Sequence, residues 1–333
     1  MAGAGTVNPA LVADVGGTNA RFALADLAAP VPVLSRARTL KTADFASLEH
    51  AAEHYLRGVG ARPASAGIAV ACPVVGDEVR LTNRAWSFSQ AALRDSLGVD
   101  RLRVCNDFGV VARALPALGA SDHVALHGRP GSPLQGPVSV LGPGTGLGVA
   151  LLVGPDPGWQ VVETEGGHVS FAPQGEEELA IARWVTARFG RASNERLLSG
   201  KGLSHIDAVL RELRTRGEAR QEVALREPAD IVGAALDGHD LDARRALARF
   251  CAVLGSVAGD TALVHGARTV AIAGGIVPRF IPFLRSSAFR ERFLAKGRFA
   301  AWLESVPIIA ITHPQPGLLG AALTLRDSLE TVP

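Results

Sequence analysis

Asn106 and Asp107 form a polar pair between a short apolar run and a segment with helical spacing. The apolar run contains Leu102, Val104 and Cys105, and the spaced apolar positions are Phe108, Val111, Ala112 and Leu115. A short polar side chain at a helix start satisfies an orphan backbone N–H, so either polar residue could be an N-cap. A carboxylate held where a strand runs into a helix could instead be a catalytic base, which makes Asp107 a candidate. The residues alone leave both interpretations open.

Three glycine loops have the composition of phosphate-binding loops. A loop that wraps a polyphosphate points backbone N–H groups inward and has no Cβ in the way, which glycine allows. The loops are Gly16-Gly17-Thr18-Asn19, Gly144-Thr145-Gly146 and Gly274-Gly275. The first two precede apolar runs typical of strands, so neither matches the dinucleotide fingerprint, whose glycines lead into a helix. Any one loop alone is more simply a tight turn, but the three together favour nucleotide binding.

Asp14 lies at the end of an apolar segment, immediately before the first glycine loop. A carboxylate in such a position is costly unless it has a partner. A magnesium ion that bridges nucleotide phosphates is one such partner, because Mg²⁺ prefers carboxylate and water oxygens. The alternative is that Asp14 only initiates an Asx-type turn. The neighbouring glycine loop favours a magnesium site at Asp14, with the contact made through water.

Glu165-Gly166-Gly167-His168 and Glu195 are candidates for binding a polyol. The two glycines place Glu165 and His168 on one compact loop, where an acceptor and a donor could hold adjacent hydroxyls. His168 could equally be an interior histidine, and Glu195 could be a first-turn carboxylate stabilised by the helix dipole. The spacing alone leaves Glu195 undecided.

The pattern of apolar residues predicts an alternation of strands and helices. Strands are expected at 10–15, 21–25, 31–40, 66–72, 78–82, 138–141, 147–153, 269–273 and 306–312. Helices are expected at 44–57 with Asp44 as cap, 90–97, 108–118, 176–189, 204–213, 229–236, 240–265 and 316–329. The charged stretch 211–227 is expected to be a solvated helix end and loop. Two hairpins of similar pattern, around the first and second glycine loops, suggest two related halves. These features predict an α/β protein of two domains, and one continuous core is the alternative.

The composition excludes several classes of function. The 333 residues are 47% apolar and 20% charged with a net charge of +2, which gives no reason to expect nucleic acid or a membrane as partner. Cys72, Cys105 and Cys251 are isolated, which argues against a zinc site and favours reduced core cysteines. The N-terminus lacks the pattern of a secretory signal, and no uncharged apolar run approaches about 20 residues. We therefore expect a soluble, cytoplasmic protein.

The motifs together resemble one family. The chain is similar to the bacterial glucokinases of the group without the zinc-binding cysteine motif, within the actin-like, hexokinase-like ATPase superfamily. The resemblance runs from Leu11 to about Asp327. The motifs occur in the family's order: LVADVGGTNARFAL, ACPVVGDEVRLTNRAWSFS, the NDF of CNDF, LGPGTGLGVALLV, EGGHVSFAP, SNERLLSGKGL, AIAGGIVPRF and HPQPGLLGAA. Departures occur at Cys105, Pro143 and Lys201, none of which is a proposed polar contact.

The resemblance implies roles for particular residues. It implies that Asp107 is the catalytic base. The glucose-binding residues it implies are Asn106, Asp107, Glu165, His168 and Glu195, with backbone near Gly146, and Asn106 is expected to offer both an amide donor and an acceptor. It also implies that residues 14–19 and 144–146 bind phosphates and that residues 273–276, with Gly274 and Gly275, bind adenosine.

The resemblance also implies a fold and an activity. The expected fold is a two-domain actin-like ATPase of the ribonuclease H-like type, with sugar in a cleft between a small domain (1–114 plus 316–333) and a large domain (115–315). The expected activity is transfer of phosphate from ATP, with Mg²⁺, to the C6 hydroxyl of glucose, and family members are commonly homodimers. The alternatives are a kinase for another hexose or an amino sugar, a sugar-sensing repressor and an actin-like filament or chaperone ATPase. The first strand is expected so early that no helix-turn-helix precedes it, which disfavours the repressor.

Overall fold

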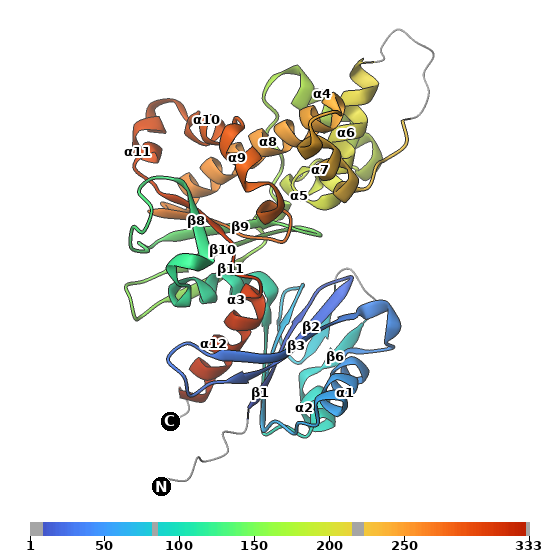
Figure 1. Ribbon diagram of the computed structural model, residues 1–333, viewed down its shortest axis with the longest axis vertical. Helices are drawn as coiled ribbons and strands as arrows, with labels where there is room; N and C mark the ends of the chain where they lie inside the picture. The colour runs from blue at the N-terminus through green and yellow to red at the C-terminus, as the bar shows by residue number, and fades with distance from the viewer. Residues whose placement is uncertain (1–8, 82–85, 215–222, 331–333) are drawn as a thin grey trace. The chain divides into compact units, whose positions relative to one another are not determined.

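The computed structural model describes residues 9–81, 86–214 and 223–330. The chain divides into two compact units, one made of residues 1–118 and 313–333 and the other of residues 119–312 (Figure 1). The boundaries predicted at 114/115 and 315/316 fall a few residues from these limits. Each unit has its own mixed sheet covered by helices, as expected for an α/β protein.

The first unit is built on a five-stranded sheet in the order β3-β2-β1-β4-β7. Its strands are β1 (Ala10–Val15), β2 (Asn19–Asp26), β3 (Val33–Lys41), β4 (Ser65–Val70) and β7 (Arg101–Asn106). β1 is antiparallel to β2, which is antiparallel to β3, whereas β1, β4 and β7 run parallel. β5 (Glu78–Arg80) and β6 (Ser87–Ser89) form a separate antiparallel two-stranded sheet.

Helices cover both faces of this sheet, because alternate side chains of a strand point to opposite faces. In β1, Leu11, Ala13 and Val15 belong to the core on the side of α1 (Leu48–Val59) and α2 (Gln90–Leu97). Val12 belongs to the core on the other side. The helices there are α3 (Asp107–Ala114), which continues as a 3-10 turn over Leu115–Ala117, and α12 (Pro316–Glu330). Figure 1 shows α3 and α12 side by side in this unit.

The second unit is built on a six-stranded sheet in the order β11-β10-β9-β12-β13-β8. Its strands are β8 (His123–His127), β9 (Val138–Pro143), β10 (Leu147–Val153), β11 (Gln160–Thr164), β12 (Thr269–Ile272) and β13 (Ile308–Ile311). Its helices are α4 (Gly175–Phe189), α5 (Asn194–Leu197), α6 (Gly200–Arg214), α7 (Pro228–Asp237), α8 (Leu241–His265), α9 (Ile281–Ser286), α10 (Phe289–Leu294) and α11 (Ala300–Glu304). Figure 1 shows the helices of this unit gathered around α8, which lies at the centre of its core.

The two sheets repeat one topology. In the second sheet β9 is antiparallel to β10, β10 is antiparallel to β11, and β9, β12 and β13 run parallel, so these five strands follow the pattern of β1, β2, β3, β4 and β7. β8 is an additional antiparallel edge strand. The two similar hairpins of the sequence are therefore the first two strands of two equivalent sheets.

Helix α8 is the most apolar long helix of the second unit. Among the described residues it alone is long and apolar enough to cross a membrane, but 67% of its most apolar stretch is buried inside the protein. Ala246, Leu247, Phe250 and Leu254 on this helix have no exposed surface. Its apolar character is therefore that of a core helix.

One local prediction was wrong. Asp44 does not cap α1, because it ends a 3-10 turn over Thr42–Asp44. The cap is Ser47, whose hydroxyl accepts a hydrogen bond from the His50 N–H at 3.3 Å. Ser47 provides the usual N-cap chemistry three residues later, so the helix begins after it.

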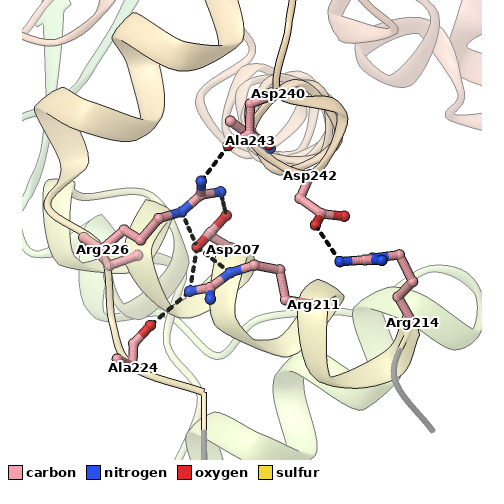
Figure 2. A network of polar contacts seen from close by, with 9 residues as sticks. Asp207, Arg211, Arg214, Ala224, Arg226, Asp240, Asp242 and Ala243 are labelled. Carbon is pink, nitrogen blue, oxygen red and sulfur yellow. Dashed lines mark hydrogen bonds and ion pairs between the residues drawn. The ribbon is translucent and has the colours of Figure 1, made fainter.

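The described part of the charged stretch 211–227 is a helix end and a largely exposed loop, as predicted, but two of its arginines also bind a neighbouring carboxylate. Arg211 and Arg226 each donate from Nε to Oδ2 of Asp207, which lies earlier on α6, at 2.9 Å (Figure 2). The Asp207 side chain has no exposed surface. Arg226 also pairs with Asp240, which caps α8 by accepting the Ala243 N–H. Residues 215–222 of the stretch lie outside the described residues.

Candidate active site

In the first unit the parallel strands bring the candidate residues to one sheet edge. β1, β4 and β7 are neighbours in parallel, with Asp14 paired to Ala69 and Val70 paired to Asn106. Their carboxyl ends therefore lie at the same edge of the sheet, where ligands bind in open α/β sheets. The first glycine loop follows β1 and Asp107 follows β7, so the candidate base and the first candidate phosphate loop share that edge.

Asn106 and Asp107 divide between them the two roles that the sequence left open. Asn106 is the N-cap of α3, because its side-chain oxygen accepts hydrogen bonds from the N–H groups of Phe108 and Gly109, both at 2.9 Å. Asp107 is then the first residue of the helix. The cap engages both lone pairs of the amide oxygen, and Nδ2 donates to the Cys72 carbonyl at 3.4 Å, so the contact of Asn106 with a sugar stays a prediction.

Asp14 has an unfavourable environment for a carboxylate. Its side chain is 22% exposed, and Arg21, opposite it on β2, approaches its Oδ2 at 3.3 Å. Burial raises the pKa of Asp14, and this effect outweighs the opposing charge and hydrogen bond of Arg21. Gly317, at the start of α12, lies so close that a Cβ there would be 2.8 Å from Oδ2. A partly buried carboxylate that ionises reluctantly is a group that a cation would stabilise.

The first glycine loop is held by a residue that sequence reasoning missed. Within the loop, the Gly16 N–H donates to the Asn19 carbonyl at 2.9 Å. Thr42 is fully buried, and its hydroxyl donates to the Gly17 carbonyl at 2.9 Å while its N–H donates to the Thr18 carbonyl at 3.0 Å. With these carbonyls engaged, Thr42 fixes the loop backbone. A lone threonine after a strand carries no signal that could have revealed this role.

In the second unit the other two glycine loops are neighbours. The Gly144 N–H donates to the Gly146 carbonyl at 2.7 Å and closes the β9–β10 loop. Gly274 has a φ of +91°, and a Cβ there would overlap the carbonyl of Pro143. Only glycine accommodates both the positive φ and this close approach. The loop is also joined to the start of α6, because the Gly200 N–H donates to the Gly144 carbonyl at 2.9 Å.

The structure also brings together the three candidate sugar residues of the second unit. The His168 ring lies between two carboxylates, with Nε2 3.8 Å from Oε2 of Glu165 and Nδ1 3.9 Å from Oε1 of Glu195. These distances are longer than hydrogen bonds, so the two carboxylates flank the His168 ring without bonding to it. The His168 side chain is 54% exposed, which rules out the interior-histidine alternative.

Glu195 connects this trio to the second glycine loop. Its Oε2 accepts the Leu147 N–H at 3.0 Å, just after the loop. A Cβ at Gly146 would overlap the same oxygen, so any side chain there would displace the Glu195 carboxylate. Glu195 does lie in the first turn of α5, but its carboxylate points to the loop, so the simple first-turn alternative does not describe it.

A magnesium–nucleotide site fits the donor set at Asp14. The described residues include no group of three His, Cys, Asp or Glu side chains that could enclose a metal by themselves. Mg²⁺ that is bound with a nucleotide needs only one or two carboxylates, because water and phosphate oxygens complete its shell. The partly buried Asp14 beside a glycine loop provides such a carboxylate.

The family follows from a comparison with known proteins. The family model described as "Glucokinase" matches residues 11–328 of the chain. The chain belongs to the glucokinase family. A glucokinase from Yersinia pestis (strain Pestoides F) is 45% identical over 321 residues, which cover 96% of this chain and 97% of that protein. The resemblance recognised from the sequence motifs is therefore confirmed.

Solved structures of glucokinases have the same fold. A glucokinase from an Antarctic psychrotroph superposes with a TM-score of 0.79 at 35% identity, covering 96% of this chain and 99% of that one. A glucokinase from Balamuthia mandrillaris, solved with glucose, gives the same TM-score of 0.79 at 22% identity, with 96% and 94% covered. The second similarity shows the fold alone. The predicted two-domain actin-like ATPase fold is confirmed.

Proposed function

We propose that this glucokinase-family chain transfers the γ-phosphoryl group of ATP to the C6 hydroxyl of glucose. Family membership supports the reaction, and one observation supports the mechanism. Asp107 begins α3 at the same edge of the first sheet as Asp14 and the first glycine loop. A carboxylate beside a phosphate loop is what a kinase needs to receive the proton of an attacking hydroxyl.

In this mechanism Asp107 is the general base. The C6 oxygen of glucose attacks the γ-phosphorus, the bond from that phosphorus to the bridging oxygen of ADP breaks, and the hydroxyl proton passes to Asp107. Asp107 lies in the first turn of α3, where the helix dipole favours a negative charge. A weak base of this kind takes the proton late, as the phosphoryl group transfers.

The other proposed roles are those that the family resemblance implies. Glu165, His168 and Glu195 hold the ring hydroxyls of glucose, with the backbone near Gly146, and Asn106 contributes from the first unit. The backbone N–H groups of residues 16–19 and 144–146 bind phosphates, and residues 273–276 bind adenosine. Mg²⁺, held through water at Asp14, neutralises phosphate charge when it is bound.

The decisive experiment is an ADP-release assay with ATP and a panel of sugars. Glucose is expected to give the highest kcat/KM, and the panel should contain mannose, fructose and N-acetylated amino sugars. A higher value for another sugar would favour the alternative kinase. No sugar-dependent ADP release, with either ATP or polyphosphate as donor, would reject the kinase assignment.

We further propose that the protein is a cytoplasmic homodimer, as the family resemblance implies. Light scattering on the purified protein is expected to give twice the chain mass of 34.6 kDa. A mass of one chain at micromolar concentration would contradict the dimer.

A further inference from the structure

The segments that carry two of the sugar residues are joined by very little backbone pairing. Residues 168–171 and 192–195 meet at one isolated antiparallel bridge, between Ser170 and Ser193. Two main-chain hydrogen bonds accompany it, from Phe171 N–H to the Ala192 carbonyl at 3.0 Å and from Asn194 N–H to the Val169 carbonyl at 2.9 Å. Because the backbone pairing is limited to this bridge, a side-chain contact between the two segments would contribute to the relative position of His168 and Glu195.

Arg191 supplies that support. Its Nη2 donates to the main-chain carbonyl of His168 at 2.7 Å and to the hydroxyl of Ser170 at 3.2 Å. The residue lies between α4 and α5, directly after Gly190, which ends α4 in a left-handed conformation. One guanidinium thus spans the two segments, and a charged donor makes such hydrogen bonds stronger than neutral ones.

The position of the His168 ring depends on this contact. The ring stands 3.8 Å from one carboxylate and 3.9 Å from the other, and the carboxylates come from different segments. Arg191 directly precedes the segment 192–195, which carries Glu195. Its guanidinium binds the backbone of His168 on the segment 168–171. Loss of the guanidinium would let the two segments separate, which would lengthen the distance between the His168 ring and the Glu195 carboxylate.

We propose that Arg191 is a positioning residue for sugar binding, because its guanidinium fixes the His168 backbone against the segment that carries Glu195. The inference rests on the proposed function, since sugar affinity is its readout. Arg191 acts through the His168 carbonyl and not on the reacting atoms. Its effect should therefore fall on the affinity for glucose and leave the nucleotide site and the global stability unchanged.

The test compares Arg191→Ala, Arg191→Lys and Arg183→Ala. Arg183 is an exposed arginine on α4, and the described part of the chain offers its side chain no hydrogen bond or ion pair, so it controls for loss of one positive charge. The measurements are KM for glucose, KM for ATP, kcat, Tm, and the Kd of glucose by calorimetry without ATP. We expect Arg191→Ala to raise the Kd and KM for glucose about five- to tenfold, as for loss of an exposed charge-assisted hydrogen bond.

The other expected results separate positioning from stabilisation. KM for ATP and Tm should match those of Arg183→Ala, and Arg191→Lys, which retains a cationic donor, should regain most of the glucose affinity. The proposal is overturned if Arg191→Ala binds glucose normally, if it loses its fold or several degrees of Tm, or if Arg191→Lys binds as weakly as Arg191→Ala. A wild-type protein that does not bind glucose at all would instead reject the proposed function.

Discussion

Asn106 and Asp107 are neighbours in sequence but have different tasks at the start of α3. The Asn106 side chain satisfies two of the orphan N–H groups of the helix. Asp107 follows as the first helical residue, where the helix dipole favours its charged form. The cap therefore fixes the start of the helix and, with it, the backbone of the proposed base.

Replacement of Asp107 by Asn should reduce kcat by roughly 10²- to 10⁴-fold, the usual contribution of general-base catalysis. The Kd for glucose should change little, because the amide can still contact a sugar hydroxyl. Steady-state kinetics and calorimetry measure the two quantities, and Asp237→Asn on the exposed end of α7 is a matched control. Turnover within a fewfold of the wild type would disprove the assignment of the base.

Replacement of Asp14 by Asn should lower the activity of the protein without lowering its thermal stability. Burial raises the pKa of Asp14, so the folded state binds this proton more tightly than the unfolded chain does. The ionised carboxylate therefore destabilises the folded state. This loss of stability appears as the pH rises above the pKa of Asp14 in the unfolded chain, which is about 3.9. We expect Asp14→Asn to unfold at an equal or higher Tm than the wild type at pH 7, and to lose most of its Mg-ATP-dependent turnover.

The pH series provides the check on Asp14. The Tm advantage of the Asn variant should shrink as the pH is lowered towards about 4, and it should vanish below that pH, where the wild-type carboxyl becomes protonated in both states. A variant that is less stable than the wild type at pH 7, or that retains full turnover, contradicts this account of Asp14.

The role of a residue could be predicted where its partners are close to it in the chain, and not where its partners come from distant segments. Glu165 and His168 share one loop, so spacing alone suggested that they act together. Glu195 lies far along the chain, and only the fold places its carboxylate against His168 and the Leu147 N–H. Thr42 and Arg191 belong to no motif, because their roles consist of contacts to backbone carbonyls of distant segments.

At the scale of elements, α3 is positioned by its close contact with α12. A Cβ at Gly320 on α12 would overlap the carbonyl of Val110 on α3. The two helices therefore approach at a distance that only glycine permits. Because Asp107 begins α3, this contact also determines where the proposed base stands relative to the sheet edge.

Replacement of Gly320 by Ala should destabilise the protein by about 1–3 kcal/mol, the typical effect of overpacking a core. Displacement of α3 should also lower kcat. Gly233→Ala is the matched control, because Gly233 lies in α7 and a Cβ there would have no neighbour within 4 Å. The control should be neutral or more stable by up to about 1 kcal/mol. Urea unfolding and steady-state kinetics give both quantities, and a Gly320→Ala protein as stable as the control contradicts the packing argument.

Long elements were predictable from sequence and short ones were not. The period of apolar residues placed α4, α7 and α8 within a few residues of their observed ends. The segment Ile281–Glu304 was not predicted as helical, because α9, α10 and α11 are too short to show a period. The buried Asp207 was missed because two arginines that look solvated in the sequence neutralise it in the fold.

At the scale of the whole molecule, each unit carries only part of the proposed site. Asp14, Asn106 and Asp107 belong to the first unit, and Glu165, His168 and Glu195 to the second. The repeat of sheet topology was suggested by the two similar hairpins of the sequence. The parallel pairing of β4 and β7, and of β12 and β13, was not, because nothing local in a sequence specifies which distant strands pair.

The proposed mechanism predicts that the protein becomes more compact when it binds glucose, because an open site would let water compete as phosphoryl acceptor. Small-angle scattering should therefore show a smaller radius of gyration with saturating D-glucose than without sugar. L-Glucose is the control, because it has the same composition and the opposite handedness, and it should leave the radius unchanged. An unchanged radius at a D-glucose concentration where calorimetry shows saturation would contradict closure, and the units would then have to be competent for transfer without moving.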